Sequence, residues 1–364
     1  MILSSEVPWN APIEVGSDES LRIGWESPAN IAFVKYWGKH GQQLPANPSV
    51  SLTLSKSIST MELIAMPTEQ GHGHLKYFYF EGQPHPDFAL RFGTFIRSLH
   101  SELPFLADFD LIISSSNSFP HSAGIASSAS GFSALALCLC TLENDLHKDQ
   151  MDKEQFLQKA SIVSRLGSGS ASRSIYGGFS VWGKTQVYSK SDDNFAVPVN
   201  ETIHPAFSKL NDTVLLISSN PKAISSSQGH NLMKGHPYRQ ARINQANSNI
   251  HILCEALRKG DWDSFIQVTE SEALSLHALM MSSSPGFILM EPSTLEIISR
   301  IREYRNRSSC PLCFTLDAGP NVHLIYHQND QNEIREFIQQ KLSPLCEKGK
   351  YIDDEVGTGP KRLK

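Results

Sequence analysis

Hydrophobic and polar positions follow two different periods along the first half of the chain. Alternation with a period of two, in segments rich in β-branched and aromatic residues, predicts strands at 31–36, 50–54, 60–65, 76–80 and 110–114. Apolar residues at helical spacing predict helices over 87–103 and 153–166. A third helix is predicted around the apolar run 132–142, which Ser133 interrupts.

The second half begins with an apolar strand at 213–218 and continues with helical patterns over 231–259, 261–282 and 292–306. Two further strands follow at 313–316 and 322–326. Strands and helices are mixed without strict β-α-β alternation, which predicts an α+β fold.

The length of the chain and one polar segment predict two domains. A chain of 364 residues exceeds the size at which a single hydrophobic core usually keeps growing. Residues 190–205 are polar, so we place the domain boundary there. We therefore expect an N-terminal extension over 1–22, an N-terminal domain over 23–200 and a C-terminal domain over 201–364.

Composition narrows the class of protein. The chain is 40% hydrophobic and 19% charged, as soluble globular proteins are. Its net charge of −5 argues against a broad nucleic-acid or anionic-membrane surface. The N-terminus lacks a basic segment followed by an apolar run, so no secretory signal is expected, and the run 132–142 is too short to span a bilayer.

The six cysteines are scattered, which fits reduced thiols and a cytoplasmic location. Cys310 and Cys313 have C-x-x-C spacing, but no second pair supplies the other ligands of a zinc site. Ordinary strand packing is therefore the favoured interpretation, and no metal ligand is assigned.

A Ser-rich loop over 114–131 lies between a predicted strand and the apolar helix. Small residues and Gly124 allow a ligand to approach the backbone closely, and the helix N-terminus behind them offers free N–H groups to a phosphate. The loop lacks the spacing of a P-loop and of the dinucleotide fingerprint. A capped helix with a small-residue packing face remains the alternative.

A second small-residue segment, G-S-G-S-A-S-R-S over 167–174, follows another helix. Such a turn can form a backbone nest for anions, and Arg173 adds a planar donor fork suited to carboxylate or phosphate. A solvated turn is the alternative. A third segment places Lys35 and Lys39 around a Tyr-Trp-Gly turn at a strand end. Alone, this third segment is weak evidence for a binding site, because lysines at strand ends are usually solvated. The three segments together, however, predict a site for two polyphosphates.

These segments resemble mevalonate diphosphate decarboxylases of the galactokinase, homoserine kinase, mevalonate kinase and phosphomevalonate kinase (GHMP) superfamily. The matching stretches are P-A-N-I-A-x-x-K-Y-W-G-K over 28–39, F-P-x-x-A-G-x-A-S-S-A-x-G-F over 119–132, G-S-G-S-A-x-R-S over 167–174, I-S-S-S-Q-G over 224–229 and D-A-G-P-N over 317–321. The resemblance runs from about residue 23 to residue 359 and implies a GHMP-type fold with the active-site cleft between two domains. It is also the basis for expecting a homodimer.

The resemblance implies conversion of mevalonate 5-diphosphate and ATP, with Mg²⁺, into isopentenyl diphosphate, ADP, phosphate and carbon dioxide. Asp317 is then the carboxylate facing the 3-hydroxyl, Lys35 its partner, and Arg173 the group that holds the substrate carboxylate. The residues implied for the substrate and its diphosphate are Tyr36, Trp37, Gly38, Lys39, Arg91, Ser168, Gly169, Ser170, Ala171, Ser172, Ser226 and Ser227. Those implied for the ATP phosphates are Ala123, Gly124, Ala126, Ser127 and Ser128.

Three positions depart from the family pattern, and several functions remain open. Gln43 stands where relatives often have Asn, His121 replaces a small residue and His230 replaces a Met. A decarboxylase acting on mevalonate 5-phosphate and a related kinase that stops after phosphorylation are the nearest alternatives, and a non-catalytic binding protein is a third. Without the resemblance, an Asp in D-A-G-P-N would most often make a turn.

Overall fold

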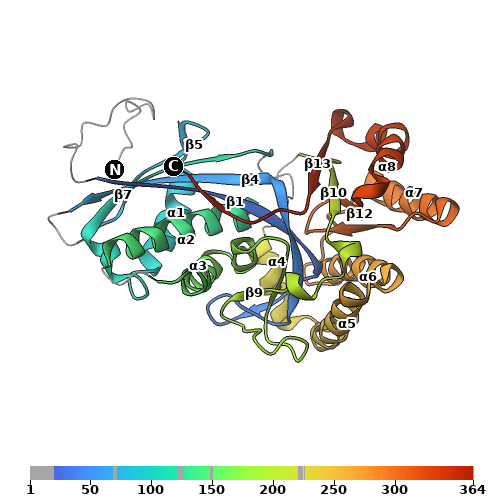
Figure 1. Cartoon of the computed structure of the whole chain (residues 1–364), viewed down its shortest axis with the longest axis horizontal. Helices are drawn as coiled ribbons and strands as arrows, with labels where there is room; N and C mark the ends of the chain where they lie inside the picture. The colour runs from blue at the N-terminus through green and yellow to red at the C-terminus, as the bar shows by residue number, and fades with distance from the viewer. Residues whose placement is uncertain are drawn as a thin grey trace.

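The chain folds into two α+β halves that lie side by side, shown in a computed structural model (Figure 1). The structure describes residues 20–68, 72–120, 127–147, 151–219, 224 and 226–363, and of residues 226 and 227 only the backbone. The predicted two-domain α+β fold is confirmed. None of the helices in these ranges is long and apolar enough to cross a membrane.

The first half is built on a sheet of eight strands within the described ranges. Its main path runs β14–β1–β4–β7–β5–β6, and β8 and β9 extend it beside β4. Among the strand pairs of this sheet in the described residues, only β5–β7 is parallel. The strands are β1 (Leu21–Val34), β4 (Ser49–Pro67), β5 (Leu75–Phe80), β6 (Gln83–Pro84), β7 (Phe109–Asn117), β8 (Phe179–Trp182), β9 (Ala196–Pro198) and β14 (Lys361–Arg362).

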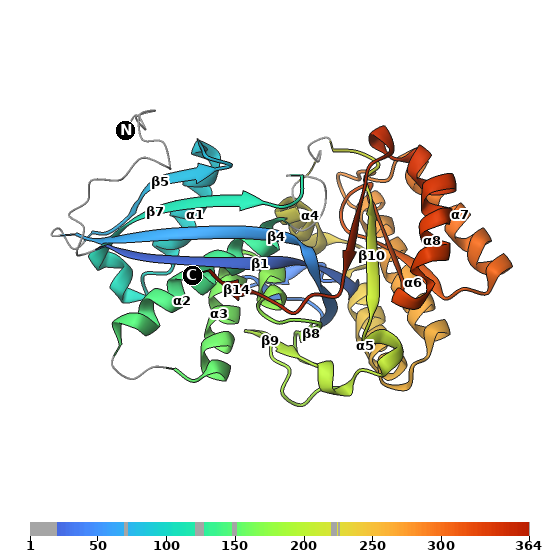
Figure 2. The ribbon, with the colours of Figure 1, turned by 45° about the horizontal axis from the view of Figure 1, so that its top comes forward.

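Helices α1 (Pro86–Ser98), α2 (Ser127–Leu146) and α3 (Lys153–Gly167) lie together along this sheet (Figure 2). Small hydroxyl residues let α2 approach it closely. Ser130 Oγ lies 2.7 Å from Ser59 Oγ on β4, and Ser133 Oγ lies 2.6 Å from Ser27 Oγ on β1. The first turns of α2 thus have the small-residue packing face that the sequence left as an alternative.

The second half contains an antiparallel sheet in the order β11–β12–β10–β13. Its strands are β10 (Leu210–Leu215), β11 (Leu312–Leu316), β12 (Val322–His327) and β13 (Tyr351–Glu355). The helices of this half are α4 (Ser226–Leu232), α5 (Arg239–Lys259), α6 (Trp262–Met281), α7 (Pro292–Ser308) and α8 (Gln331–Phe337). Cys313 is buried in β11, in a core shared with α5 and α6.

Two predicted divisions between elements are wrong for identifiable reasons. The strands predicted at 50–54 and 60–65 are one continuous strand, β4, because the Asp354 carboxylate accepts the N–H groups of Ser55, Lys56 and Ser57 at 2.7–2.8 Å. The Asp354 side chain thus binds the backbone between the two predicted strands, in place of a partner strand. The helix predicted over 231–259 is divided into α4 and α5, since Pro237 lies between them and cannot continue a helical ladder.

The C-terminal segment joins the two halves. After β13 in the second sheet, Val356 bridges Leu54 of β4, and β14 then pairs with β1 through Trp25 and Arg362. In Figure 2 this segment crosses from the second sheet back along the first. The C-terminal segment therefore pairs with strands of both sheets, which meet where β1 and β11 end.

Candidate active site

Lys35 and Asp317 meet at the junction of the two sheets. Lys35 directly follows β1, and Asp317 directly follows β11. Lys35 Nζ lies 3.1 Å from Asp317 Oδ1, so the expected ion pair is present. The lysine side chain is 2% exposed and the aspartate 26%. Burial lowers the pKa of Lys35, whereas the charge of Asp317 acts to raise it. The Asp317 carboxylate is thus partly exposed to solvent, and the Lys35 amine is buried behind it.

Arg173 approaches the same junction from the turn η2 (Gly169–Ile175). Its Nη1 donates to Ser49 Oγ at 2.7 Å and its Nε to Asn30 Oδ1 at 3.2 Å. Burial lowers the pKa of Arg173 to about 10, and the charge of Asp317 opposes this lowering. The guanidinium therefore stays charged at neutral pH, fixed in position and electrostatically coupled to Asp317.

The Tyr-Trp-Gly turn after Lys35 has a buried interior side. Trp37 packs against Met233 and the end of α6, so its indole belongs to the core rather than to an open binding surface. The Tyr36 hydroxyl is buried and has no hydrogen-bond partner among the described residues, and burial raises its pKa. Gly38 has a φ of +94°, a conformation that favours glycine.

The side chain of Lys39 is partly exposed beside this turn. Its Nζ donates to Gln43 Oε1 at 2.9 Å, so the family departure at position 43 still provides an acceptor. Burial and the neighbouring charge of Lys234 lower the pKa of Lys39. A cation held here by one neutral amide is available for an anionic ligand.

His230 on α4 lies against the same turn. Its ring centroid is 4.3 Å from that of Tyr36 and 4.6 Å from that of Trp37. Burial lowers the pKa of His230 to about 3, with smaller contributions from Lys39 and Arg173. The other departure by a histidine, His121, lies outside the described residues.

The predicted turn over 167–174 has an open and a buried side. The hydroxyls of Ser168 and Ser170 are partly exposed and lie 3.4 Å apart. Ala171 and Ser172 are buried, and Ser172 Oγ donates to the Gly169 carbonyl at 2.8 Å, closing the turn from behind. The open side is therefore made by two serines, and the other residues shape the backbone.

Arg91 lies with Ser127 and Ser128. These three residues line one small pocket at the N-terminal end of α2. The Arg91 guanidinium carbon is 4.9 Å from the centroid of the Phe132 ring. Ala123, Gly124 and Ala126 lie outside the described residues. Ser226 and Ser227 begin α4, where only their backbone is described.

Several supporting residues were not predicted from the sequence. Asn30 and Ser49 hold Arg173, and His277 Nε2 lies 3.1 Å from the Asp317 carbonyl oxygen. Arg242 and Glu272 form a buried ion pair of 2.6 Å beside Lys35. The only signal of this pair in the sequence is a charged residue at an inward position of each of two helices.

Two α+β domains that bring Lys35, Arg173 and Asp317 together at their junction have the arrangement expected of a GHMP-type small-molecule kinase fold. The profile of the diphosphomevalonate decarboxylase-like N-terminal domain matches residues 27–196. That of the mevalonate 5-diphosphate decarboxylase C-terminal domain matches residues 213–361. The chain belongs to the mevalonate diphosphate decarboxylase family.

Individual relatives are similar to this chain over most of its length. The diphosphomevalonate decarboxylase of Saccharomyces cerevisiae is 30% identical over 332 residues, covering 86% of this chain and 79% of that protein. The crystal structure of mevalonate diphosphate decarboxylase from Staphylococcus aureus has a TM-score of 0.80 at 26% identity, covering 95% of this chain and 98% of that one. The enzyme structure from Legionella pneumophila has a TM-score of 0.75 at 29% identity, covering 88% and 98%.

Proposed function

We propose that this chain catalyses the ATP-dependent decarboxylation of mevalonate 5-diphosphate to isopentenyl diphosphate, with release of ADP, phosphate and carbon dioxide. The observation that carries the proposal is the contact of 3.1 Å between Lys35 and Asp317 at the domain junction. Arg173 couples electrostatically to the same carboxylate. Membership in the decarboxylase family supplies the substrate class.

In this proposal Asp317 faces the 3-hydroxyl of the substrate, where it accepts the hydroxyl proton or stabilises developing positive charge. Lys35 keeps the carboxylate ionised, because a nearby cation favours the charged form. The partial exposure of Asp317 leaves a path for substrate, whereas burial of Lys35 fixes the amine behind it.

Arg173 binds the substrate carboxylate and turns it into the geometry for elimination. A guanidinium offers two parallel donors to a carboxylate, which a single ammonium does not. Ser168, Ser170 and Lys39 bind the diphosphate, since they are partly exposed polar groups around this junction. Tyr36 contributes a buried hydroxyl that is free to donate to a ligand oxygen.

Ser127 and Ser128 bind the ATP phosphates at the N-terminus of α2, where backbone N–H groups and the helix dipole favour anions. Arg91 adds a cation in the same pocket. Because it lines this pocket with Ser127 and Ser128, we assign it to phosphate binding there.

A Mg²⁺ ion carried by the nucleotide fits this donor set. Nucleotide sites usually hold Mg²⁺ through substrate phosphates, waters and one or two protein oxygens. Among the residues that the structure describes, no three His, Cys, Asp or Glu side chains form a metal-binding group. The hydroxyls of Ser127 and Ser128 would be its neighbours on the protein, and the ion would neutralise phosphate charge.

Coupled assays for ADP and carbon dioxide with mevalonate 5-diphosphate and mevalonate 5-phosphate test the function. Release of both products with the diphosphate supports it. Release of both with the monophosphate alone would identify the monophosphate decarboxylase instead, and ADP without carbon dioxide would identify a kinase. We further propose a cytoplasmic homodimer on the basis of family resemblance. Sedimentation of the purified chain, compared with its monomer mass of 40.4 kDa, tests the dimer.

A further inference from the structure

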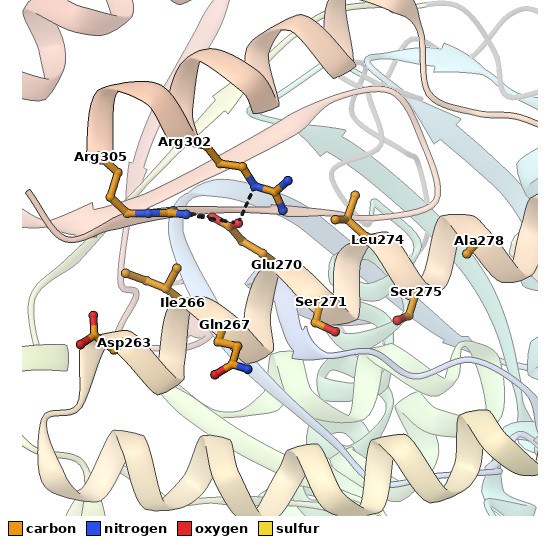
Figure 3. Close-up of a pocket in the computed structure, with 10 residues that line it drawn as sticks. All are labelled: Asp263, Ile266, Gln267, Glu270, Ser271, Leu274, Ser275, Ala278, Arg302 and Arg305. Atoms are coloured by element: carbon orange, nitrogen blue, oxygen red, sulfur yellow. Dashed lines mark hydrogen bonds and ion pairs between the residues drawn. The ribbon is translucent and has the colours of Figure 1, made fainter. Parts of the chain in front are cut away.

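Two buried carboxylates leave helix α6 in opposite directions. Glu270 and Glu272 are two positions apart, and at about 100° per residue their side chains are separated by about 200° around the helix axis. Figure 3 shows Glu270 directed toward α7, where Arg302 Nε lies 3.1 Å and Arg305 Nη1 2.5 Å from its oxygens. Glu272 is directed toward the end of β1 and is 0% exposed.

The carboxylate of Glu272 binds the backbone of Lys35 as well as an arginine. Its Oε2 accepts the Lys35 N–H at 2.8 Å. Arg242 on α5 donates to both carboxylate oxygens, at 2.7 and 2.6 Å, in a bidentate pair. The Nη2 of Arg242 also donates to the Lys35 carbonyl oxygen at 2.9 Å. One ion pair therefore engages both polar groups of the Lys35 backbone.

The position of Lys35 in the chain explains why this contact is needed. β1 ends at Val34, so the Lys35 peptide has left the strand ladder. Its N–H and carbonyl are nevertheless buried, and buried backbone groups without partners are costly. Asn47 Nδ2 supplies a further donor to the carbonyl at 3.0 Å, and Asn249 Nδ2 donates to Glu272 Oε1 at 2.7 Å. Together these contacts surround the backbone N–H and carbonyl of Lys35.

We propose that Arg242 and Glu272 are positioning residues for the reaction. They clamp the Lys35 backbone from the C-terminal domain and thereby set the position of its amine against Asp317. This inference rests on the proposed function for its kinetic consequence. Misplacement of a catalytic group by about 1 Å can reduce the rate by about 100-fold, so a clamp on the backbone of a buried lysine acts on kcat.

The first test replaces both members of the pair, Arg242→Met together with Glu272→Leu. Removing one partner alone leaves an uncompensated buried charge and strongly destabilises a protein, whereas apolar replacement of both is often tolerated. We expect ATP affinity within about threefold of the native value and a kcat lower by about 10- to 100-fold. The second variant, Glu272→Asp, keeps the charge but shortens the side chain by one methylene. It should likewise keep its ATP affinity while its kcat falls.

Glu270→Gln is the matched control, because it alters an arginine-bound buried carboxylate on the same helix that faces α7 instead of Lys35. We expect its kcat within about twofold of the native value. Hydrogen exchange at the Lys35 amide provides a readout independent of activity. Exchange should be faster in both Glu272 variants and unchanged in Glu270→Gln.

The outcomes separate this inference from the proposed function. A native chain without decarboxylase activity would refute the function, while the exchange measurement would still test the clamp. A double variant that binds ATP and retains kcat within about threefold would overturn the positioning role. Failure of both Glu272 variants to fold or to bind ATP would assign the pair to stability alone and would also overturn it.

Discussion

The imidazole Nδ1 of His230 accepts the backbone N–H of Gly38 at 3.0 Å. This bond attaches α4 to the turn between Lys35 and Lys39, and the His230 ring lies against the rings of Tyr36 and Trp37. An acceptor Nδ1 requires that this nitrogen carry no proton. The contact therefore depends on a neutral imidazole, in agreement with the pKa of about 3 that burial gives His230.

The His230→Met variant should change the pH dependence of stability. The folded-state pKa of His230 is about 3 and its ordinary value is 6.5. Between these values the unfolded chain binds the additional proton, so stability is complete above pH 6.5 and falls as the pH is lowered, by up to about 1.4 kcal/mol per pH unit. Urea unfolding from pH 7 to pH 4 should give a shallower loss for His230→Met than for the native chain. Equal slopes would contradict a buried neutral imidazole. His251→Met, which alters an exposed histidine, is the control.

Gly169→Ala should destabilise the protein. An added Cβ would lie 2.7 Å from Trp182 and 2.9 Å from the Tyr36 hydroxyl oxygen, distances that force two packed rings to move. We expect a loss of about 1–3 kcal/mol in the free energy of unfolding, as overpacking usually causes. The control is Gly235→Ala, where an added Cβ meets no atom within 4 Å. Unchanged stability in Gly169→Ala would show that the turn tolerates a larger backbone separation.

Replacing Ser128 with Leu should weaken ATP binding without unfolding the protein. The residue lines the small pocket at the N-terminus of α2, where a bulky side chain would fill the space we assign to phosphate. The apparent KM for ATP should rise about tenfold or more, equivalent to about 1.4 kcal/mol of lost binding. Ser101→Leu, at an exposed position, is the control. A folded Ser128→Leu variant with native ATP affinity would move the nucleotide site elsewhere.

Much of the fold could be predicted because its signals are local. The helical spacing over 153–166 and the strand pattern over 322–326 correspond to α3 and β12 within a few residues. β13, β14 and the continuity of β4 were missed, since they depend on Asp354 and on pairings between residues hundreds of positions apart.

The candidate site shows the same limit. The family resemblance indicated Lys35, Arg173 and Asp317, because the short motifs that contain them match those of the family. The Arg242–Glu272 pair has no local motif, since only the packing of α5, α6 and β1 brings the charges together. The buried position of Trp37 was likewise not predicted, because a strand-end aromatic residue can face solvent or core equally well.

Arg173→Lys should lose both affinity and rate. Lysine keeps the charge but cannot donate to Asn30 and Ser49 while also offering two parallel donors to a carboxylate. We expect a higher KM for mevalonate 5-diphosphate, a lower kcat and release of some 3-phosphorylated intermediate. Mass detection of products after a single turnover checks this. Native kinetics with no intermediate would remove the orienting role of the guanidinium.

The most direct test of the central claim is single-turnover product formation by Asp317→Asn. Asparagine keeps the size of the side chain and removes the charge that faces Lys35 Nζ at 3.1 Å. If Asp317 acts in the transition state, kcat falls by about 10²- to 10⁴-fold while the KM for mevalonate 5-diphosphate changes little. A folded Asp317→Asn variant that releases carbon dioxide at a near-native rate would contradict the proposed mechanism.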